Sequence, residues 1–207
     1  MRPQEIALFG TSADPPSIGH RSILAWLAQN FDLCVVWVSD NPFKQHQATL
    51  EQRLAMMELT IADLQPEARN IELAPHIAHS RTIFTVEKAR HIWQSANFTL
   101  VVGADILPQL PKWYRSADLL SQVKLLVMPR AGIAVSPDLI EPIEKLGTTV
   151  AIAPVAIPNV SSTAYRHDHD DQVILPSVKN YIQQQNIYQW FTLEMGSEGL
   201  EPPTASV

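Results

Sequence analysis

Residues 6–20 read IALFGTSADPPSIGH and carry the strongest structural signal in the chain. The apolar run at residues 6–9 is typical of a buried strand, and it ends at Gly10. From residue 23 to residue 31, apolar side chains recur at the spacing of one helix face. The stretch is therefore predicted to form a strand, a tight loop and the start of a helix.

The predicted loop is a candidate phosphate site. The start of a helix presents free backbone N–H groups and a partial positive charge, so it can hold an anion. Gly10 and Gly19 let the backbone approach such an anion, and His20 adds a side-chain donor. An ordinary strand-to-helix turn fits the same residues equally well. The sequence contains neither G-x-x-x-x-G-K-[ST] nor G-x-G-x-x-G, so a P-loop and a dinucleotide fingerprint are poor interpretations.

Length and composition indicate one globular domain that binds neither nucleic acid nor membrane. The chain has 207 residues, of which 46% are hydrophobic. Its formal net charge of -6 argues against a broad nucleic-acid surface, and no apolar run is long enough to span a membrane. The single cysteine, Cys34, lies in an apolar run and is predicted to be a buried strand residue. With one cysteine no internal disulfide can form, which favours a cytoplasmic location.

Strand-like and helix-like segments alternate along the chain. Strands are predicted at residues 6–9, 33–38, 70–73, 98–102, 123–128 and 149–153. Helices are predicted at residues 20–29, 50–64, 82–95, 113–120, 137–146 and 175–185. This alternation favours an α/β fold with a Rossmann-like, doubly wound parallel sheet. We assign the single domain to residues 1–191 and a polar, flexible tail to residues 192–207.

Polar residues follow several predicted strands, and ligands of parallel sheets bind beyond the carboxyl ends of the strands. Asp105, after Gly103, is placed to accept hydrogen bonds from a ribose or to cap the next turn. Lys44 and His46 either lie near a phosphate or are solvated loop residues. Trp113 either stacks on a flat ring of a ligand or belongs to the core.

Two hydroxyl-rich segments precede predicted helices. Ser80 is a natural N-cap for a helix that begins at Thr82, and the same helix start can contact a ligand. The three hydroxyl residues 161–163 and Arg166 form either a phosphate clamp or a capped helix with a surface arginine. The histidines and aspartates of residues 167–171 are predicted to be a solvated helix end, because neighbours on a helix point in different directions. No metal site is predicted.

The opening stretch resembles the signature of the nucleotidylyltransferases, which is roughly G-G-T-F-D-P-x-H-x-G-H. The positions that match in register are Gly10, Asp14, Pro15, Gly19 and His20. Ser17 stands where the signature has its first histidine.

Further segments, in order, resemble the motifs of the bacterial nicotinate-nucleotide adenylyltransferases. Residues 51–56 are similar to E-x-R-x-x-M, and residues 80–85 are similar to S-Y-T-x-x-T. Residues 102–105, followed by Trp113, are similar to G-A-D…W. Residues 160–166 are similar to I-S-S-T-x-x-R, and the resemblance extends over most of the chain.

The resemblance implies transfer of AMP from ATP to nicotinate mononucleotide, with Mg²⁺ carried by ATP and with deamido-NAD and pyrophosphate as products. The phosphate of the mononucleotide attacks the α-phosphorus directly, so no protein nucleophile is required. The residues expected to be catalytic are His20, Ser17, Arg166 and Lys44. The residues expected to bind the nucleotide are Gly10, Thr11, Asp14, Gly19, Gly103, Asp105, Ser161, Ser162 and Thr163, with Asp105 on a ribose hydroxyl. The residues expected to contact the mononucleotide are Ser80, Thr82 and Trp113, whose indole would stack on the pyridine ring.

Two other interpretations stay open. The acceptor could be nicotinamide mononucleotide or phosphopantetheine in place of nicotinate mononucleotide. Alternatively, because Ser17 replaces a histidine, the chain could be a nucleotide-binding protein with weakened catalysis. A serine hydroxyl lacks the charge of an imidazolium, which predicts a rate roughly tenfold lower unless Lys44 or His46 compensates.

Overall fold

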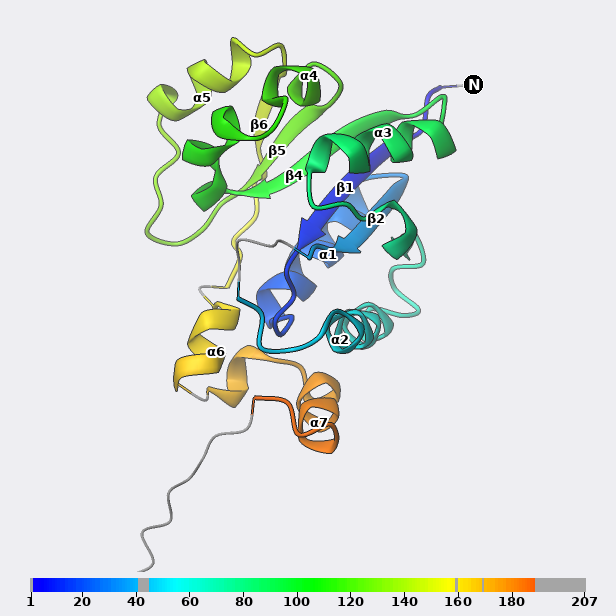
Figure 1. The fold of residues 1–207 in the computed structure, drawn as a ribbon, viewed down its shortest axis with the longest axis vertical. Helices are drawn as coiled ribbons and strands as arrows, with labels where there is room; N and C mark the ends of the chain where they lie inside the picture. The colour runs from blue at the N-terminus through cyan, green and yellow to red at the C-terminus, as the bar shows by residue number, and fades with distance from the viewer. Residues whose placement is uncertain (1, 41–44, 159, 169, 189–207) are drawn as a thin grey trace, which may run out of the picture.

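The computed structural model describes residues 2–40, 45–158, 160–168 and 170–188 (Figure 1). The described strands form one parallel sheet in the order β3-β2-β1-β4-β5-β6. They are β1 Glu5–Thr11, β2 Leu33–Val38, β3 Ile71–Leu73, β4 Asn97–Gly103, β5 Lys124–Met128 and β6 Val150–Ile152. The strand order reverses between β1 and β4, which confirms the doubly wound, Rossmann-like fold predicted from the alternation.

Helices cover both faces of the sheet (Figure 1). One face is covered by α1 Ile18–Asn30 and α2 Leu50–Ala62. The other face is covered by η1 Pro75–Ile77, α3 Thr82–Ile92, η2 Ala104–Lys112, α4 Ser116–Leu120 and α5 Pro137–Glu144, where η denotes a 3-10 helix. The elements after the last strand are α6 Ser162–Asp168, η3 Asp171–Val173 and α7 Pro176–Gln184.

The apolar run of β1 supplies both halves of the core. Successive side chains of a strand point to opposite faces of the sheet. Ile6 and Leu8 therefore pack with α3 and η2, whereas Ala7 and Phe9 pack with α1 and α2. A strand that is buried on both faces needs apolar residues at every position, which explains why β1 shows no alternation of polar and apolar residues.

A third apolar cluster joins α7 to the outer side of α2. Met57 of α2 faces the sheet, while the neighbouring Met56 is fully buried against α7 with Val178 and Ile182. Helix α2 is thus sandwiched between the sheet and the last described helix. This layer brings the C-terminal end of the described chain, Tyr188, back to the loop that follows β1.

One predicted helix is wrong in its first half. Residues 104–112 form the 3-10 helix η2, which contains Pro108 and Pro111, and Trp113 ends it. Helix α4 begins only after Arg115, whose backbone is left-handed with a φ of 53°. A left-handed residue interrupts a right-handed helix, so the apolar spacing of residues 113–120 corresponds to a helix only from Ser116 onward.

Three further expectations concern the tail, a membrane span and the single cysteine. The predicted tail at residues 192–207 lies outside the described residues. Within the described residues, no helix has the length and apolar character needed to cross a membrane. Cys34 is buried in β2, as predicted, and burial raises the pKa of its thiol to about 12.

Candidate active site

The candidate site lies at the carboxyl end of β1, where the start of α1 meets the start of α6. A Cβ atom built on Gly19 of α1 would lie 3.3 Å from the Val160 side chain, which precedes α6. The Ser162 hydroxyl of α6 donates to the Pro15 carbonyl at 2.7 Å. The fold therefore brings together the two segments, residues 10–20 and 160–166, that are far apart in the sequence but share the predicted phosphate chemistry.

The His20 ring is held at both of its nitrogens. The Ser17 backbone N–H donates to His20 Nδ1 at 3.0 Å, and the Ser17 hydroxyl lies 2.9 Å from the same nitrogen. On the other side of the ring, Nε2 lies 2.8 Å from the Thr11 hydroxyl oxygen. Because a backbone N–H can only donate, Nδ1 must accept, and the proton of the neutral ring sits on Nε2. In the free protein Nε2–H donates to the Thr11 hydroxyl oxygen, so a phosphate at the end of β1 would have to take this donor over from Thr11.

His20 is neutral at pH 7 in the free protein. Burial, and secondly the positive charge of Arg130, lower the pKa of His20 from 6.5 to about 4. His20 would therefore contact a phosphate through the Nε2–H of a neutral ring, and it would contribute a hydrogen bond without a positive charge.

The lowered pKa of His20 makes the free energy of unfolding depend on pH. The unfolded chain binds more protons than the folded chain between pH 6.5 and pH 4. His20 therefore leaves stability unchanged above pH 6.5 and lowers it as the pH falls toward 4, by about 3 kcal/mol in total. Urea unfolding at several pH values measures this loss, and a His20→Asn variant should lose less stability than the wild type. Equal losses in the two proteins would contradict the assignment.

Ser17 is a positioning residue for His20. It is the N-cap residue of α1 and is 2% exposed, so its hydroxyl is directed at the imidazole and away from solvent. The predicted role of Ser17 as a direct catalytic group stays untested, but the geometry gives it a clear structural task. The sequence indicated a departure from a signature at this position and did not indicate that the serine would contact the histidine three residues later.

A Ser17→Ala variant should reduce turnover only modestly. It removes the hydroxyl contact with His20 Nδ1 but keeps the backbone N–H bond that selects the tautomer. Loss of one hydrogen bond to a neutral ring corresponds to roughly a threefold to tenfold lower kcat. Steady-state rates at saturating substrate measure this effect. A loss of a thousandfold would contradict it, because the hydroxyl would then be taking part in the chemistry itself.

Asp14 is buried and joins four parts of the chain. It is 3% exposed, and its carboxylate accepts the backbone N–H groups of Gln47 at 3.0 Å and Ala48 at 3.2 Å. The Tyr188 hydroxyl donates to the same carboxylate at 2.5 Å, and this contact adds to burial in raising the pKa of Tyr188. Arg166 Nη1 donates to the Asp14 backbone carbonyl. These contacts hold the loop in place, and a direct contact of Asp14 with nucleotide stays a prediction.

The predicted clamp residues of α6 surround this loop. Arg166 Nη1 lies 3.9 Å from an Asp14 carboxylate oxygen, and Arg166 Nη2 donates to the Thr163 hydroxyl at 3.4 Å. The Ser161 hydroxyl accepts the Ala164 backbone N–H at 3.0 Å and so caps the helix. Ser162 and Arg166 therefore contact the loop between β1 and α1 directly, and the binding of nucleotide by these residues, Ser161 and Thr163 stays a prediction.

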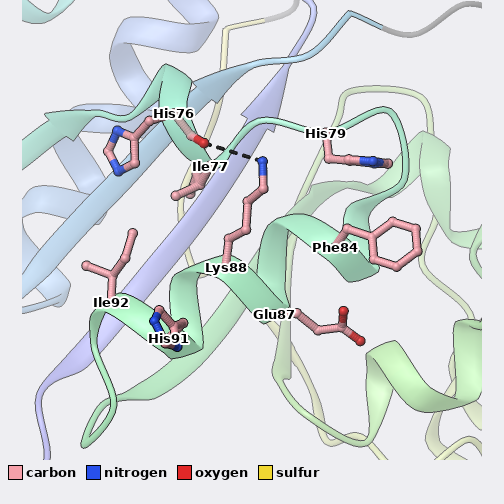
Figure 2. A pocket seen from close by; sticks show the side chains of 8 residues that line it. All are labelled: His76, Ile77, His79, Phe84, Glu87, Lys88, His91 and Ile92. Atoms are coloured by element: carbon pink, nitrogen blue, oxygen red, sulfur yellow. Dashed lines mark hydrogen bonds between the residues drawn. The ribbon is translucent and has the colours of Figure 1, made fainter.

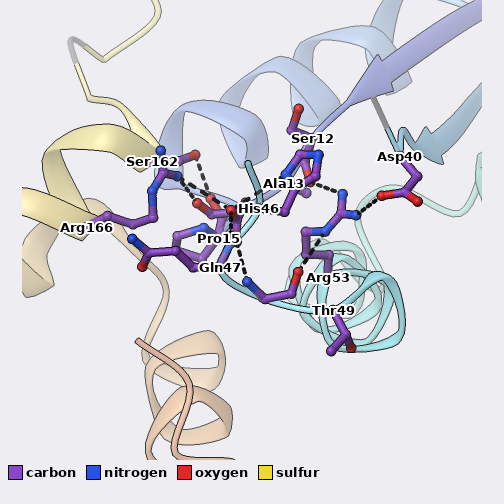
Figure 3. Close-up of polar contacts among 12 residues, drawn as sticks. Ser12, Ala13, Pro15, Asp40, His46, Gln47, Thr49, Arg53, Ser162 and Arg166 are labelled. Carbon is purple, nitrogen blue, oxygen red and sulfur yellow. Dashed lines mark hydrogen bonds and ion pairs between the residues drawn. The ribbon is translucent and has the colours of Figure 1, made fainter. Parts of the chain in front are cut away.

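Arg53 organises the same loop from the opposite side (Figure 3). Its side chain is 1% exposed, and its Nη1 donates to the carbonyls of Ser12 at 3.0 Å and Ser39 at 2.8 Å. Its Nη2 donates to Asp40 at 2.8 Å, and its Nε donates to the Ala48 carbonyl at 3.3 Å. One buried guanidinium thus ties together the ends of β1 and β2 and the segment before α2. Arg53 is the arginine of the segment that resembles E-x-R-x-x-M, but the helical spacing of that segment did not indicate that its side chain would be buried against the loop.

His46 lies beside this network, whereas Lys44 lies outside the described residues. His46 Nδ1 is 3.6 Å from an Asp14 carboxylate oxygen. Burial, and then Arg53, lower the pKa of His46. Its Nε2 is buried and has no hydrogen-bond partner within the described part of the chain. The predicted phosphate contact of Lys44 stays a prediction.

Asp105 lies where β4 ends, as predicted, and it has a charged partner that the sequence did not reveal. Arg130 Nη1 lies 3.3 Å from an Asp105 carboxylate oxygen, and both side chains are partly exposed. Arg130 follows the end of β5 by two residues, so the rule that polar residues after parallel strands share one edge would have found it. The absence of a side chain at Gly103 makes room for Asp105, because a Cβ there would lie 2.5 Å from its carboxylate.

Gly10 is required by packing. A Cβ atom at Gly10 would lie 2.3 Å from the indole of Trp37, which is buried in β2. This contact alone explains why a larger residue would not fit at position 10. The expectation that Gly10 lets the backbone approach an anion stays a prediction. Thr11, next along the strand, keeps its predicted place at the site through its contact with His20.

The segments predicted to bind the mononucleotide lie side by side. Arg81, between Ser80 and Thr82, places its guanidinium 3.9 Å from the centroid of the Tyr114 ring. Trp113 immediately precedes Tyr114 and packs, partly buried, against the core cluster that includes α3. The structure therefore joins Trp113 to the start of α3, which is the juxtaposition that the two motifs implied. Trp113 is partly buried against the core, as one of the two sequence interpretations predicted, and its stacking on a ligand ring stays a prediction.

A hollow is lined by side chains of η1, of α3 and of the segment between them (Figure 2). Its volume is about 550 Å³. The side chains that line it are His76, Ile77, His79, Phe84, Glu87, Lys88, His91 and Ile92.

Within the part of the chain that the structure describes, no group of three or more His, Cys, Asp or Glu side chains is arranged to hold a metal ion.

The doubly wound fold and the predicted phosphate site are typical of a nucleotide-binding α/β protein. Comparisons with known proteins identify the family to which the chain belongs. The cytidylyltransferase-like family matches residues 8–168. A protein of Synechocystis sp. named as a probable nicotinate-nucleotide adenylyltransferase is 37% identical over 198 residues, covering 89% of this chain and 99% of the relative. A protein of the same name from Gemmatimonas aurantiaca is 34% identical and covers 78% of this chain and 79% of the relative. The chain therefore belongs to the cytidylyltransferase-like family and, within it, to the family of nicotinate-nucleotide adenylyltransferases.

Solved structures show the same fold. The nicotinic acid mononucleotide adenylyltransferase of Plasmodium falciparum, complexed with NaAD, superposes with a TM-score of 0.77 at 17% sequence identity. The alignment covers 89% of this chain and 97% of that chain. At 17% sequence identity this similarity shows a shared arrangement of strands and helices and does not assign roles to individual side chains.

Proposed function

We propose that the chain transfers the adenylyl group of ATP to nicotinate mononucleotide, forming deamido-NAD and releasing pyrophosphate. The observation that carries this proposal is the His20 ring, held between Ser17 and Thr11 at the carboxyl end of β1. A preorganised donor at this edge of a parallel sheet is placed to contact phosphate groups as their charge redistributes. Membership of the family supports the same reaction.

The reaction needs no nucleophile from the protein. An oxygen of the mononucleotide phosphate attacks the α-phosphorus of ATP, and the bond between that phosphorus and the leaving pyrophosphate breaks. The protein contributes position and charge. His20 donates to phosphate through Nε2–H in place of its bond to Thr11, and Arg166 supplies a guanidinium from α6. Asp105 accepts a ribose hydroxyl, and Trp113 stacks on the pyridine ring of the mononucleotide.

Mg²⁺ enters this proposal as part of the substrate. The triphosphate of ATP supplies oxygen ligands of the kind that Mg²⁺ prefers, and the ion usually keeps several waters as well. In this proposal the chain's own groups act on the phosphates that carry the ion. A cytoplasmic location and the absence of nucleic-acid and membrane partners remain proposals from composition.

Pyrophosphate release by the purified protein tests the proposal. The assay uses ATP and Mg²⁺ with nicotinate mononucleotide, nicotinamide mononucleotide or phosphopantetheine as separate acceptors. We expect release that clearly favours nicotinate mononucleotide. Preference for either other acceptor would replace the proposed substrate, and ATP binding without release on any acceptor would support the binding-protein interpretation.

A further inference from the structure

Four arginines of the chain differ in how their charge is compensated. Arg130 pairs with Asp105 at 3.3 Å, and Arg166 lies 3.9 Å from Asp14. Arg115 lies 2.7 Å from an oxygen of Asp118 and 3.3 Å from one of Glu87. Arg81 has no carboxylate within 4.0 Å among residues 2–40, 45–158, 160–168 and 170–188. Its charge is therefore available to a ligand.

The Arg81 side chain is nevertheless held in place. Its guanidinium stacks on the Tyr114 ring at 3.9 Å, and a cation over an aromatic face is attracted by the ring quadrupole. The Tyr114 ring in turn packs on Phe84 of α3, with the ring centroids 6.0 Å apart. The Arg81 backbone N–H donates to His79 Nδ1 at 3.0 Å, which fixes the residue at the start of α3. These contacts preorganise the guanidinium and lower the entropy lost when it binds an anion.

The turn that carries Trp113 is tied to the same helix. Arg115 of this turn bonds Glu87 of α3, and Tyr114 stacks on Arg81. Trp113 lies directly before Tyr114, so the turn that carries the predicted stacking residue is the turn that contacts the Arg81 guanidinium. The segment that contains Arg81 resembles S-Y-T-x-x-T, and the arginine stands at the position of its tyrosine. The positive charge at position 81 is thus present in this chain and absent from the motif S-Y-T-x-x-T.

We propose that Arg81 selects nicotinate mononucleotide over nicotinamide mononucleotide by donating guanidinium N–H groups to the nicotinate carboxylate. This inference rests on the proposed function, because it takes Trp113 as the residue that holds the pyridine ring. Nicotinate carries a carboxylate where nicotinamide carries a neutral amide. A guanidinium forms charge-assisted, bidentate hydrogen bonds with a carboxylate and gains no comparable bond with an amide. Tyr114 acts as a positioning residue, since it holds the guanidinium flat.

Steady-state kinetics of an Arg81→Gln variant test the inference. At saturating ATP, KM and kcat are measured for each mononucleotide. Loss of a hydrogen bond to a charged group corresponds to a KM for nicotinate mononucleotide that is about 10- to 100-fold higher. The KM for nicotinamide mononucleotide, the KM for ATP and kcat should change by less than about twofold. An Arg81→Lys variant keeps the charge without the fork of donors and should recover only part of the preference.

Arg90→Gln is the matched control, because Arg90 lies at the other end of α3 and stacks on Phe98 at 5.8 Å. It removes the same charge from the same helix and should leave the preference for nicotinate unchanged. An Arg81→Gln variant with an unchanged preference, or with equal rises in both KM values, would overturn the role of Arg81 while leaving the proposed function intact. Wild-type protein that uses neither mononucleotide would overturn the proposed function, and this inference with it.

Discussion

An Arg53→Met variant should lose about 3–5 kcal/mol of its free energy of unfolding. The Arg53 side chain is 1% exposed and donates to three backbone carbonyls and to Asp40. Methionine fills a similar volume but offers no donor, so the carbonyls of Ser12, Ser39 and Ala48 would lose their guanidinium bonds. A loss of this size lowers the melting temperature of a domain of this length by roughly 10 °C. Urea unfolding monitored by tryptophan fluorescence gives the free energy directly.

The matched control is Arg69→Met, because Arg69 is an exposed arginine that lies beyond α2. Exposed substitutions of this kind change stability by no more than about 0.5 kcal/mol. If the Arg53 and Arg69 variants were equally stable, Arg53 would not hold the loop between β1 and α1. The same network also supports the site, so a folded Arg53→Met protein at low temperature should still show reduced turnover.

A His20→Ala variant should lower kcat/KM for adenylyl transfer by about 100- to 1,000-fold, the usual cost of removing one preorganised donor at a reacting phosphate or oxyanion. The ring donates through Nε2–H and is neutral at pH 7, because burial and Arg130 lower its pKa to about 4. The loss should appear mainly in kcat, since the donor acts on charge that shifts during the reaction.

His91→Ala is the matched control for this measurement. His91 is exposed on the last turn of α3, away from the His20 loop, and its loss should leave kcat/KM unchanged. The thermal unfolding of both variants is recorded so that a loss of fold is distinguished from a loss of chemistry. A His20→Ala enzyme within threefold of the wild type would show that this donor does not act on the reacting phosphates.

Much of the fold could be predicted from local patterns. The continuous apolar runs of β1 and β2 predicted buried strands, and in the structure both are buried and have a neighbour on each side. The rule that ligands bind beyond the carboxyl ends of parallel strands predicted the edge that holds Thr11, His20 and Asp105. The error at residues 113–120 has a local cause, since the left-handed backbone of Arg115 delays the start of α4 to Ser116.

The contacts that build the site were harder to predict, because they join residues far apart in the sequence. The Asp14 carboxylate and the Tyr188 hydroxyl are separated by most of the chain, and no periodicity signals such a bond. The same holds for Arg53 and for the pair of Asp105 and Arg130. Glycine patterns are also ambiguous in principle, since Gly10 suits a phosphate loop and equally suits the indole of Trp37. Sequence could thus predict which segments form the site, and the structure was needed to identify which side chains orient the others.

Direct transfer between the two substrates is the central claim, and one measurement addresses it most directly. ATP labelled at the α-phosphate is incubated with the protein and Mg²⁺, first alone and then with nicotinate mononucleotide, while pyrophosphate, deamido-NAD and labelled protein are quantified. The account predicts no pyrophosphate and no labelled protein until the mononucleotide is added, and equal amounts of pyrophosphate and deamido-NAD afterwards. Pyrophosphate release with label on the protein in the absence of the mononucleotide, or release without deamido-NAD in its presence, would contradict it.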